Sequence, residues 1–241
     1  AAPDGYTLLL APTAHAINPA IIRRLPYDTQ RDLAPISTLA FFDLGLFVPA
    51  ASRLTDLRAL LAEAKARPGR LNVGTIAVGS TQNLGAELFK SATSLNFQIV
   101  PYRGTPDVIV ALLRNDIQMM IDFYGPMKST LADRKIRPLG TSGAERSPFF
   151  TDVPTVAQAG VPGYEVPSWN GMFAPLGTPP DIIALLNRSI REIVAIPEVQ
   201  HRYAELGIEA KASSPEELKA KLESDIKKWA ALIDRAGIQR L

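Results

Sequence analysis

Short apolar runs along the chain alternate with segments whose apolar residues recur at helical spacing. The runs lie at residues 6–10, 41–48, 71–76, 98–102, 117–123, 136–141 and 169–174, and turn residues such as Pro3-Asp4-Gly5 bound them. An apolar run of this length between turn signals is typical of a buried strand. The pattern therefore predicts a series of short strands.

Helical patterns fill most of the intervals between these strands. Apolar residues from Leu57 to Ala64 stand at helical offsets behind a predicted N-cap at Thr55, and Pro68-Gly69 ends that helix. Similar patterns predict helices over 18–24, 81–91, 106–114 and 126–133, with Ser80 capping the second of these and a proline opening the third. Strands that alternate with helices favour an α/β fold with mostly parallel sheet flanked by helices.

The alternation of predicted strands and helices ends after Gly143, and from there helix follows helix with little strand between. A capping box is predicted at 178–181 ahead of a helix that includes Ile182 and Ile190, and a second at 214–217 ahead of a helix that reaches about Arg235. No flexible linker or repeat is present, so two lobes would share more than one connecting strand. The strands at 41–48, 136–141 and 169–174 are the candidates for those connections.

Charge and composition exclude several classes of protein. The chain has 241 residues and a formal net charge of +2, which is too small a field to indicate nucleic-acid binding. Residues 51–140 hold 12 basic and 7 acidic residues, an excess that suggests an anionic partner. Cysteine is absent, which excludes disulfides and thiolate sites, and no apolar run reaches the roughly 18 residues of a membrane helix.

Motifs for catalysis or nucleotide binding are scarce. The two histidines, His15 and His201, do not stand at a metal-binding spacing, and the sequence holds no nucleophile elbow, Walker A loop or dinucleotide fingerprint. A hydrolase triad of Ser80, His15 and Asp122 can be drawn as an alternative. A serine between a strand and a helix is far more often a cap, so we do not expect an enzyme. Because the motifs named above are missing, we also expect no metal and no cofactor.

Loops rich in small and hydroxyl residues follow four predicted strands, at 11–18, 77–81, 102–105 and 122–125. Ligands collect at the carboxyl ends of parallel strands, where helix N-termini carry partial positive charge. Two such helix starts facing one cleft would make a carboxylate receptor without needing an arginine. The structural alternatives are that Ser80 and Thr105 only cap helices, that Asp122 only bonds a nearby loop N–H, and that His15 is satisfied locally.

The chain resembles the Bug family, the solute-binding receptors of tripartite tricarboxylate transporters. The resemblance runs through the whole chain and is carried by these motifs, in order: Pro3-Asp4-Gly5-Tyr6-Thr7, Leu25-Pro26-Tyr27-Asp28, Ala64-Lys65-Ala66-Arg67-Pro68-Gly69, Gly79-Ser80, Val100-Pro101-Tyr102-Arg103-Gly104, Asp122, Asp152-Val153-Pro154-Thr155, Pro162-Gly163-Tyr164-Glu165, Trp169-Asn170-Gly171 and Ala236-Gly237-Ile238.

The resemblance implies a periplasmic protein with two α/β lobes and a ligand cleft between them, lobe 1 being residues 1–48 with 141–241 and lobe 2 being 49–140. The expected partners are a small carboxylate and membrane permease subunits, and the alternative role is a ligand-sensing module for a signalling partner. Asp122 is a candidate for selecting ligands with an ammonium group, and Asn83, where the family often has histidine, is expected to point away from the ligand. The candidate ligand-binding residues are Thr13, Ala14, His15, Ala16, Val78, Gly79, Ser80, Thr81, Arg103, Thr105, Asp122 and Phe123.

One departure from the family concerns the N-terminus. Family members have another strand, a loop and a helix ahead of the Pro-Asp-Gly-Tyr motif, whereas this sequence starts at Ala1. The resemblance therefore implies that a strand–helix–strand unit of about 50 residues is missing. We also expect the strand at 6–10 to present an exposed edge.

Overall fold

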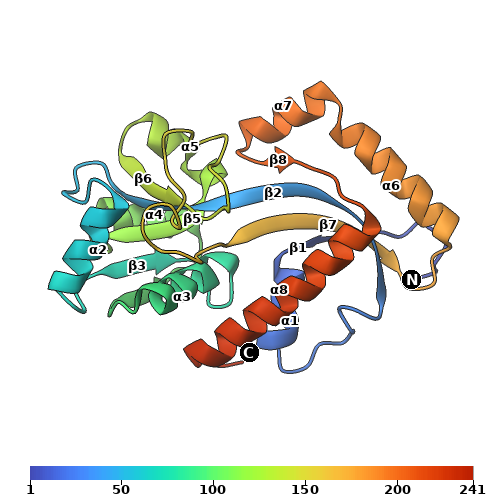
Figure 1. Cartoon of the computed structure of the whole chain (residues 1–241), viewed down its shortest axis with the longest axis horizontal. Coiled ribbons are helices and arrows are strands. Elements are labelled where there is room, and N and C mark those ends of the chain that lie inside the picture. The colour runs from blue at the N-terminus through green and yellow to red at the C-terminus, as the bar shows by residue number, and fades with distance from the viewer. Residues whose placement is uncertain (241) are drawn as a thin grey trace. The chain divides into compact units, whose positions relative to one another are not determined.

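The computed structural model describes residues 1–240 and divides the chain into two compact units (Figure 1). Unit 1 comprises Ala1–Phe42 together with the chain from Ser168 onward, and unit 2 comprises Asp43–Pro167. These divisions differ from the predicted lobes, because residues 43–48 and 141–167 belong to unit 2. Two contacts within unit 2 explain the second difference. Ser142 Oγ donates to the Val166 carbonyl, and Thr141 forms an isolated parallel β-bridge with Thr155.

Unit 2 contains the parallel part of the sheet. Strand β3 (Asn72–Thr75) pairs in parallel with β4 (Gln98–Pro101) and with β5 (Met119–Phe123). The second half of β2 (Leu33–Pro49) pairs antiparallel with β5 and with β6 (Ile136–Thr141). The helices are α2 (Leu57–Ala66), α3 (Thr81–Thr93), α4 (Thr105–Leu113) and α5 (Tyr124–Ala132).

The core of unit 2 lies against this sheet. Phe47, Met120, Val108 and Leu112 are buried in one cluster, so residues from β2 and β5 pack against α4. Gly74 on β3 lies under this packing, because an added Cβ would come within 2.2 Å of Ile117 and 2.8 Å of Val108. Strand β3 therefore packs closely against α4 and the turn that leads into β5.

Unit 1 has antiparallel strands and helices that follow one another. Strand β1 (Leu9–Pro12) pairs with β7 (Pro167–Pro175), and β8 (Glu209–Ala210) pairs with the first half of β2. The helices are α1 (Ala14–Ile21), α6 (Pro180–Val194), α7 (Pro197–Glu205) and α8 (Pro215–Ala236), and α8 packs along α1 (Figure 1). Trp169 and Trp229 are buried in this unit.

The predicted α/β class is confirmed, but the strand pairing is mixed rather than mostly parallel. Parallel pairing joins β3 to β4 and β5, where strand–helix–strand units follow each other. In unit 1 the helices α6 and α7 occur in succession after β7, so they do not return the chain to a parallel neighbour. The strands predicted at 41–48 and 169–174 lie close to the positions where the chain passes from one unit to the other, whereas 136–141 lies wholly in unit 2.

Several element boundaries differ from the predictions for local reasons. The strand expected at 6–10 is β1 at Leu9–Pro12, because Asp4 Oδ1 accepts from the Tyr6 N–H in a turn. Asp56 caps α2 in place of Thr55, and its Oδ1 accepts from Ala59 N at 2.8 Å. Thr178 does not cap α6, since its hydroxyl donates to the Pro175 carbonyl. The capping box at Ser214 is confirmed, with Glu217 as its second member.

Candidate functional site

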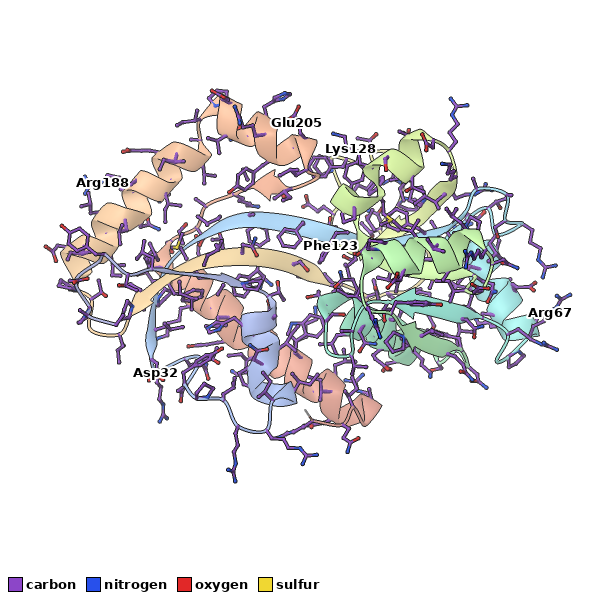
Figure 2. All side chains as sticks on the ribbon, turned by 180° about the vertical axis from the view of Figure 1, so that it is seen from behind. Asp32, Arg67, Phe123, Lys128, Arg188 and Glu205 are labelled. Carbon is purple, nitrogen blue, oxygen red and sulfur yellow. The ribbon has the colours of Figure 1, made fainter. Side chains whose placement is uncertain are left out.

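Three helices of unit 2 begin where parallel strands end. Helix α3 follows β3, α4 follows β4 and α5 follows β5 directly. Because the three strands are parallel neighbours, their carboxyl ends lie at one edge of the sheet and the helix N-termini gather there. Figure 2 shows Phe123 at this edge, where β5 passes into α5. We call this region, made of residues 78–82, 103–105 and 122–124, the carboxyl-edge site.

Asp122 connects the starts of all three helices. Its Oδ1 accepts from Gln82 Nε2 at 3.0 Å and from the Phe123 N–H at 2.8 Å, and its Oδ2 accepts from Thr105 Oγ1 at 2.6 Å. The carboxylate is 1% exposed. A buried carboxylate is costly unless donors surround it, and here donors from α3, α4 and the start of α5 do so. Asp122 therefore fixes the relative positions of the three helix N-termini.

Ser80 and Asn83 shape the loop that enters α3. Ser80 Oγ accepts from Asn83 N at 3.1 Å, which confirms the predicted N-cap. Asn83 is buried, its Oδ1 accepts from Gly79 N at 3.1 Å and its amide donates toward Thr75 Oγ1 at 3.4 Å. The Asn83 side chain therefore holds the loop through Gly79, and the expectation that it points away from the ligand stays a prediction. That glycine has φ +81°, a conformation that L side chains rarely adopt.

The outer part of this edge is accessible. Val78 is 45% exposed, Arg103 is exposed, and Ser80, Thr81 and Thr105 are half-buried. The first N–H groups of a helix lack partners within the helix, so they are donors for an approaching ligand. The geometry of the carboxyl-edge site thus suits an acceptor-rich, negatively charged group.

In unit 1 the predicted segment 13–16 forms the start of α1. Thr13 Oγ1 accepts from Trp169 N at 2.7 Å and donates to the Trp169 carbonyl at 3.2 Å, which joins this start to β7. Ala14 is half-buried and Ala16 is buried, so neither offers a polar side chain. The structure thus assigns Thr13 a fixed contact with β7.

His15 lies in an aromatic environment within unit 1. Its ring stacks on Tyr27 at 5.7 Å between centroids and lies 5.4 Å from the ring of Phe173, and the Tyr27 hydroxyl is 3.5 Å from Nδ1. Burial lowers the pKa of His15 below its usual range, and a backbone interaction with Thr29 offsets part of that effect. Among residues 1–240, no hydrogen-bond partner faces the buried Nε2. His15 is therefore held as a neutral, packed side chain.

A buried polar network supports Trp169 from the side of α8. Trp169 Nε1 donates to Asp225 Oδ2 at 2.7 Å, and Lys221 Nζ lies 2.9–3.0 Å from both Asp225 oxygens. Because Trp169 also contacts Thr13 through its backbone, Asp225 helps to position the start of α1. Neither Asp225 nor Gln82 was among the predicted site residues, since each acts through tertiary contacts that leave no motif.

The structure gives no support to the hydrolase alternative. Ser80 Oγ is engaged as a helix cap and the Asp122 oxygens accept from Gln82, Thr105 and Phe123, so in unit 2 the two side chains do not bond each other.

Across residues 1–240 no group of three or more His, Asp or Glu side chains could hold a metal ion. None of the helices within that range is both long and apolar enough to cross a membrane.

The fold is that of an α/β protein in which three helix N-termini gather at one edge of a sheet. The family described as tripartite tricarboxylate transporter family receptor matches residues 1–238. This chain belongs to that family of solute-binding receptors, as the sequence motifs predicted.

Individual relatives support the same assignment. Protein BugT of Bordetella pertussis is 32% identical over 238 residues, which cover 98% of this chain and 73% of that protein. A protein of R. palustris solved with adipate is 33% identical, with a TM-score of 0.85 and coverage of 100% of this chain and 81% of that chain. MatC of Rhodopseudomonas palustris, solved with bound malate, is 27% identical, with a TM-score of 0.78 and coverage of 97% and 81%.

Proposed function

We propose that this protein is a periplasmic solute-binding receptor that captures a small carboxylate and delivers it to a membrane permease. The observation that carries the proposal is the convergence of the N-termini of α3, α4 and α5 at the carboxyl edge of unit 2. Membership of the receptor family supports the transport role. Two related structures, named for adipate and for malate, support a dicarboxylate as the class of ligand.

The chemistry of recognition follows from the exposed donors at this edge. Backbone N–H groups of the first turns, the Ser80 and Thr105 hydroxyl groups and the Arg103 guanidinium can all donate to carboxylate oxygens. Donation from backbone N–H groups depends on loop conformation, which Asp122 and Asn83 fix in advance. A ligand that meets an already ordered loop loses less free energy to ordering on binding.

The remaining predicted residues are proposed as contacts of the same ligand class, each within its own unit. Val78, Gly79, Thr81 and Phe123 would contribute backbone N–H groups and apolar contact in unit 2. In unit 1, the segment 13–16 would contribute the N-terminus of α1, with His15 supplying its unpartnered Nε2. The side chains of Thr13 and His15 are thus expected to matter less for binding than the backbone of this segment.

Replacing Ser80 by aspartate tests the proposal without removing the helix cap. Aspartate is as good an N-cap as serine, so the fold should keep its stability, while its negative charge should repel a carboxylate at the same position. We expect adipate or malate to raise the melting temperature of the wild-type chain by several degrees. Ligand at about 100 times Kd adds about 2.7 kcal/mol, and the Ser80→Asp variant should lose that shift.

The matched control is Ser214→Asp, the same change at the N-cap of α8 in unit 1. This variant should show the wild-type shift with each dicarboxylate. An unchanged ligand response in Ser80→Asp, or equal losses in both variants, would contradict binding at the carboxyl edge.

A further inference from the structure

A polar cavity lies at the end of the unit 2 sheet opposite the carboxyl-edge site, where β3 and β5 begin. Its volume is about 780 Å³. The loop between β2 and α2, the last turns of α2, and the turns that lead into β3 and β5 line it. None of the residues of the carboxyl-edge site belongs to its lining. We call it the arginine pocket, after Arg53, Arg67 and Arg70.

Positive charge in this pocket exceeds negative charge. Arg53 and Arg67 both form ion pairs with Glu63, which is the acidic residue of the lining, and the Arg67–Glu63 distance is 3.4 Å. The side chains of Arg53 and Arg67 remain 65% and 59% exposed. Arg70 is exposed, and within residues 1–240 its guanidinium has no hydrogen-bond or ion-pair partner. The pocket therefore holds three guanidinium groups and one carboxylate, and that carboxylate pairs with only two of them.

A fourth guanidinium, that of Arg137, adds positive charge next to the loop between β2 and α2. Arg137 on β6 donates to the carbonyl groups of Ala50 and Ser52, the latter at 3.1 Å, and Ser52 lines the pocket. In the described chain, 1–240, the buried Arg137 Nε has no hydrogen-bond partner. Carbonyl groups hold this side chain in place but do not neutralise its charge.

The walls of the pocket are ordered by contacts of their own. Gln118 Oε1 accepts from Asn72 N at 3.0 Å and its Nε2 donates to the Asn115 carbonyl at 3.2 Å, so the turn into β5 is tied to the start of β3. Leu60 and Leu71 are buried and also line the pocket. Guanidinium groups above a fixed, partly apolar floor resemble a binding pocket more than a freely solvated charged face.

We propose that the arginine pocket binds a polycarboxylate anion. The planar fork of a guanidinium matches a carboxylate in two parallel hydrogen bonds, and Arg70 is free to form them while Arg67 can exchange Glu63 for a ligand. The same chemistry is offered by a free tricarboxylate and by neighbouring acidic side chains of a protein segment. The proposal does not depend on the function proposed above, because its residues lie at the other end of the sheet.

The test uses the full chain and fluorescein-labelled hexaglutamate, with binding followed by fluorescence anisotropy at low ionic strength. We expect Arg67→Gln/Arg70→Gln to bind about tenfold more weakly, which corresponds to about 1.4 kcal/mol for the loss of two exposed charge pairs. Glu63→Gln should bind more tightly, because it removes the competing carboxylate.

Unlabelled citrate and unlabelled hexaglutamate then serve as competitors. Displacement by citrate would identify a free polycarboxylate as a sufficient ligand, and displacement by the peptide alone would identify an acidic segment.

The matched control is Arg188→Gln on α6, which removes one positive charge from an exposed helix face of unit 1 (Figure 2). Its affinity should equal that of the wild type, and Ser80→Asp should also leave hexaglutamate binding unchanged. Three results would overturn the proposal: no peptide binding, equal weakening by Arg188→Gln, or loss of binding in Ser80→Asp. Arginine-dependent binding to phosphatidylglycerol vesicles without peptide binding would instead assign the surface to a membrane.

Discussion

At the scale of single residues, the side chain that organises the carboxyl-edge site is Asp122. Its position at the end of an apolar strand was predictable, but its role was not. The three donors that surround it come from residues 82, 105 and 123, which only the tertiary fold brings together. A selective contact with a ligand ammonium group would require an oxygen that faces the ligand, and Asp122 is 1% exposed. We therefore assign it the role of positioning the helix starts.

Replacing Asp122 by asparagine separates positioning from selectivity. The amide keeps an acceptor but loses the charge at three helix N-termini, so unfolding free energy should fall by about 1–3 kcal/mol. Glutarate and glutamate differ by one ammonium group, and a positioning role predicts that their affinities fall by the same factor. Calorimetric titration of both ligands measures this ratio. A loss confined to glutamate would show that Asp122 contacts the ammonium group.

His15 makes the stability of the fold depend on pH. Its pKa is lowered by burial, so the folded protein disfavours the protonated ring while the unfolded chain does not. Its contribution is therefore complete above the unfolded pKa of about 6.5, and it is lost as pH falls from there through the lower pKa of the folded state. Urea unfolding of the wild type should show falling stability from neutral to mildly acidic pH.

The variant His15→Phe should show a smaller fall over the same range, because its side chain does not titrate. His201→Gln is the control, since His201 lies on an exposed face of α7 with its side chain 75% exposed. This control should retain the wild-type dependence on pH. An equal fall in His15→Phe and the wild type would contradict the assigned role of His15.

At the scale of elements, α8 supports the start of α1 through a side chain that was not predicted. Asp225 accepts from the indole of Trp169 and pairs with Lys221, and the Trp169 backbone contacts Thr13. In Asp225→Asn, Lys221 loses its ion-pair partner and the indole loses a charged acceptor. Unfolding free energy should fall by about 1–3 kcal/mol, as measured by chemical denaturation.

The control for this change is Asp234→Asn, near the end of the same helix, where the side chain is 70% exposed. An exposed ion pair contributes little, so the control should change stability by less than about 0.5 kcal/mol. Similar effects in the two variants would show that the buried network adds no stability of its own.

Elements with strong local signals were predictable, and elements set by distant partners were not. Ser80 and Ser214 were identified as caps because cap residues bond their own first turn. The prediction that Thr178 caps α6 was wrong, because its hydroxyl donates to the Pro175 carbonyl in the preceding turn. The spacing of residues in the sequence does not show which of these two bonds forms. Strand β2 extends to 17 residues, well beyond the apolar run at 41–48, and different parts of it pair with β8, with β5 and with β6.

At the scale of the whole molecule, the α/β class and the receptor family followed from the sequence, while the division into units followed less well. The segment 141–167 has few apolar positions at regular spacing, so nothing local assigned it to either unit. Contacts of Ser142 with Leu44 and Val166 place it in unit 2. Contacts between residues that are far apart in sequence therefore decide where a unit ends.

Amide NMR shifts on the full ¹⁵N-labelled chain would locate the bound carboxylate residue by residue. Adipate should shift the amide signals of residues 79–82, 104–105 and 123–124 most strongly, because their N–H groups lie at the starts of α3, α4 and α5. Shifts confined to residues 52–54, 67–71 and 115–118, or no saturable shifts with either adipate or malate, would contradict this prediction.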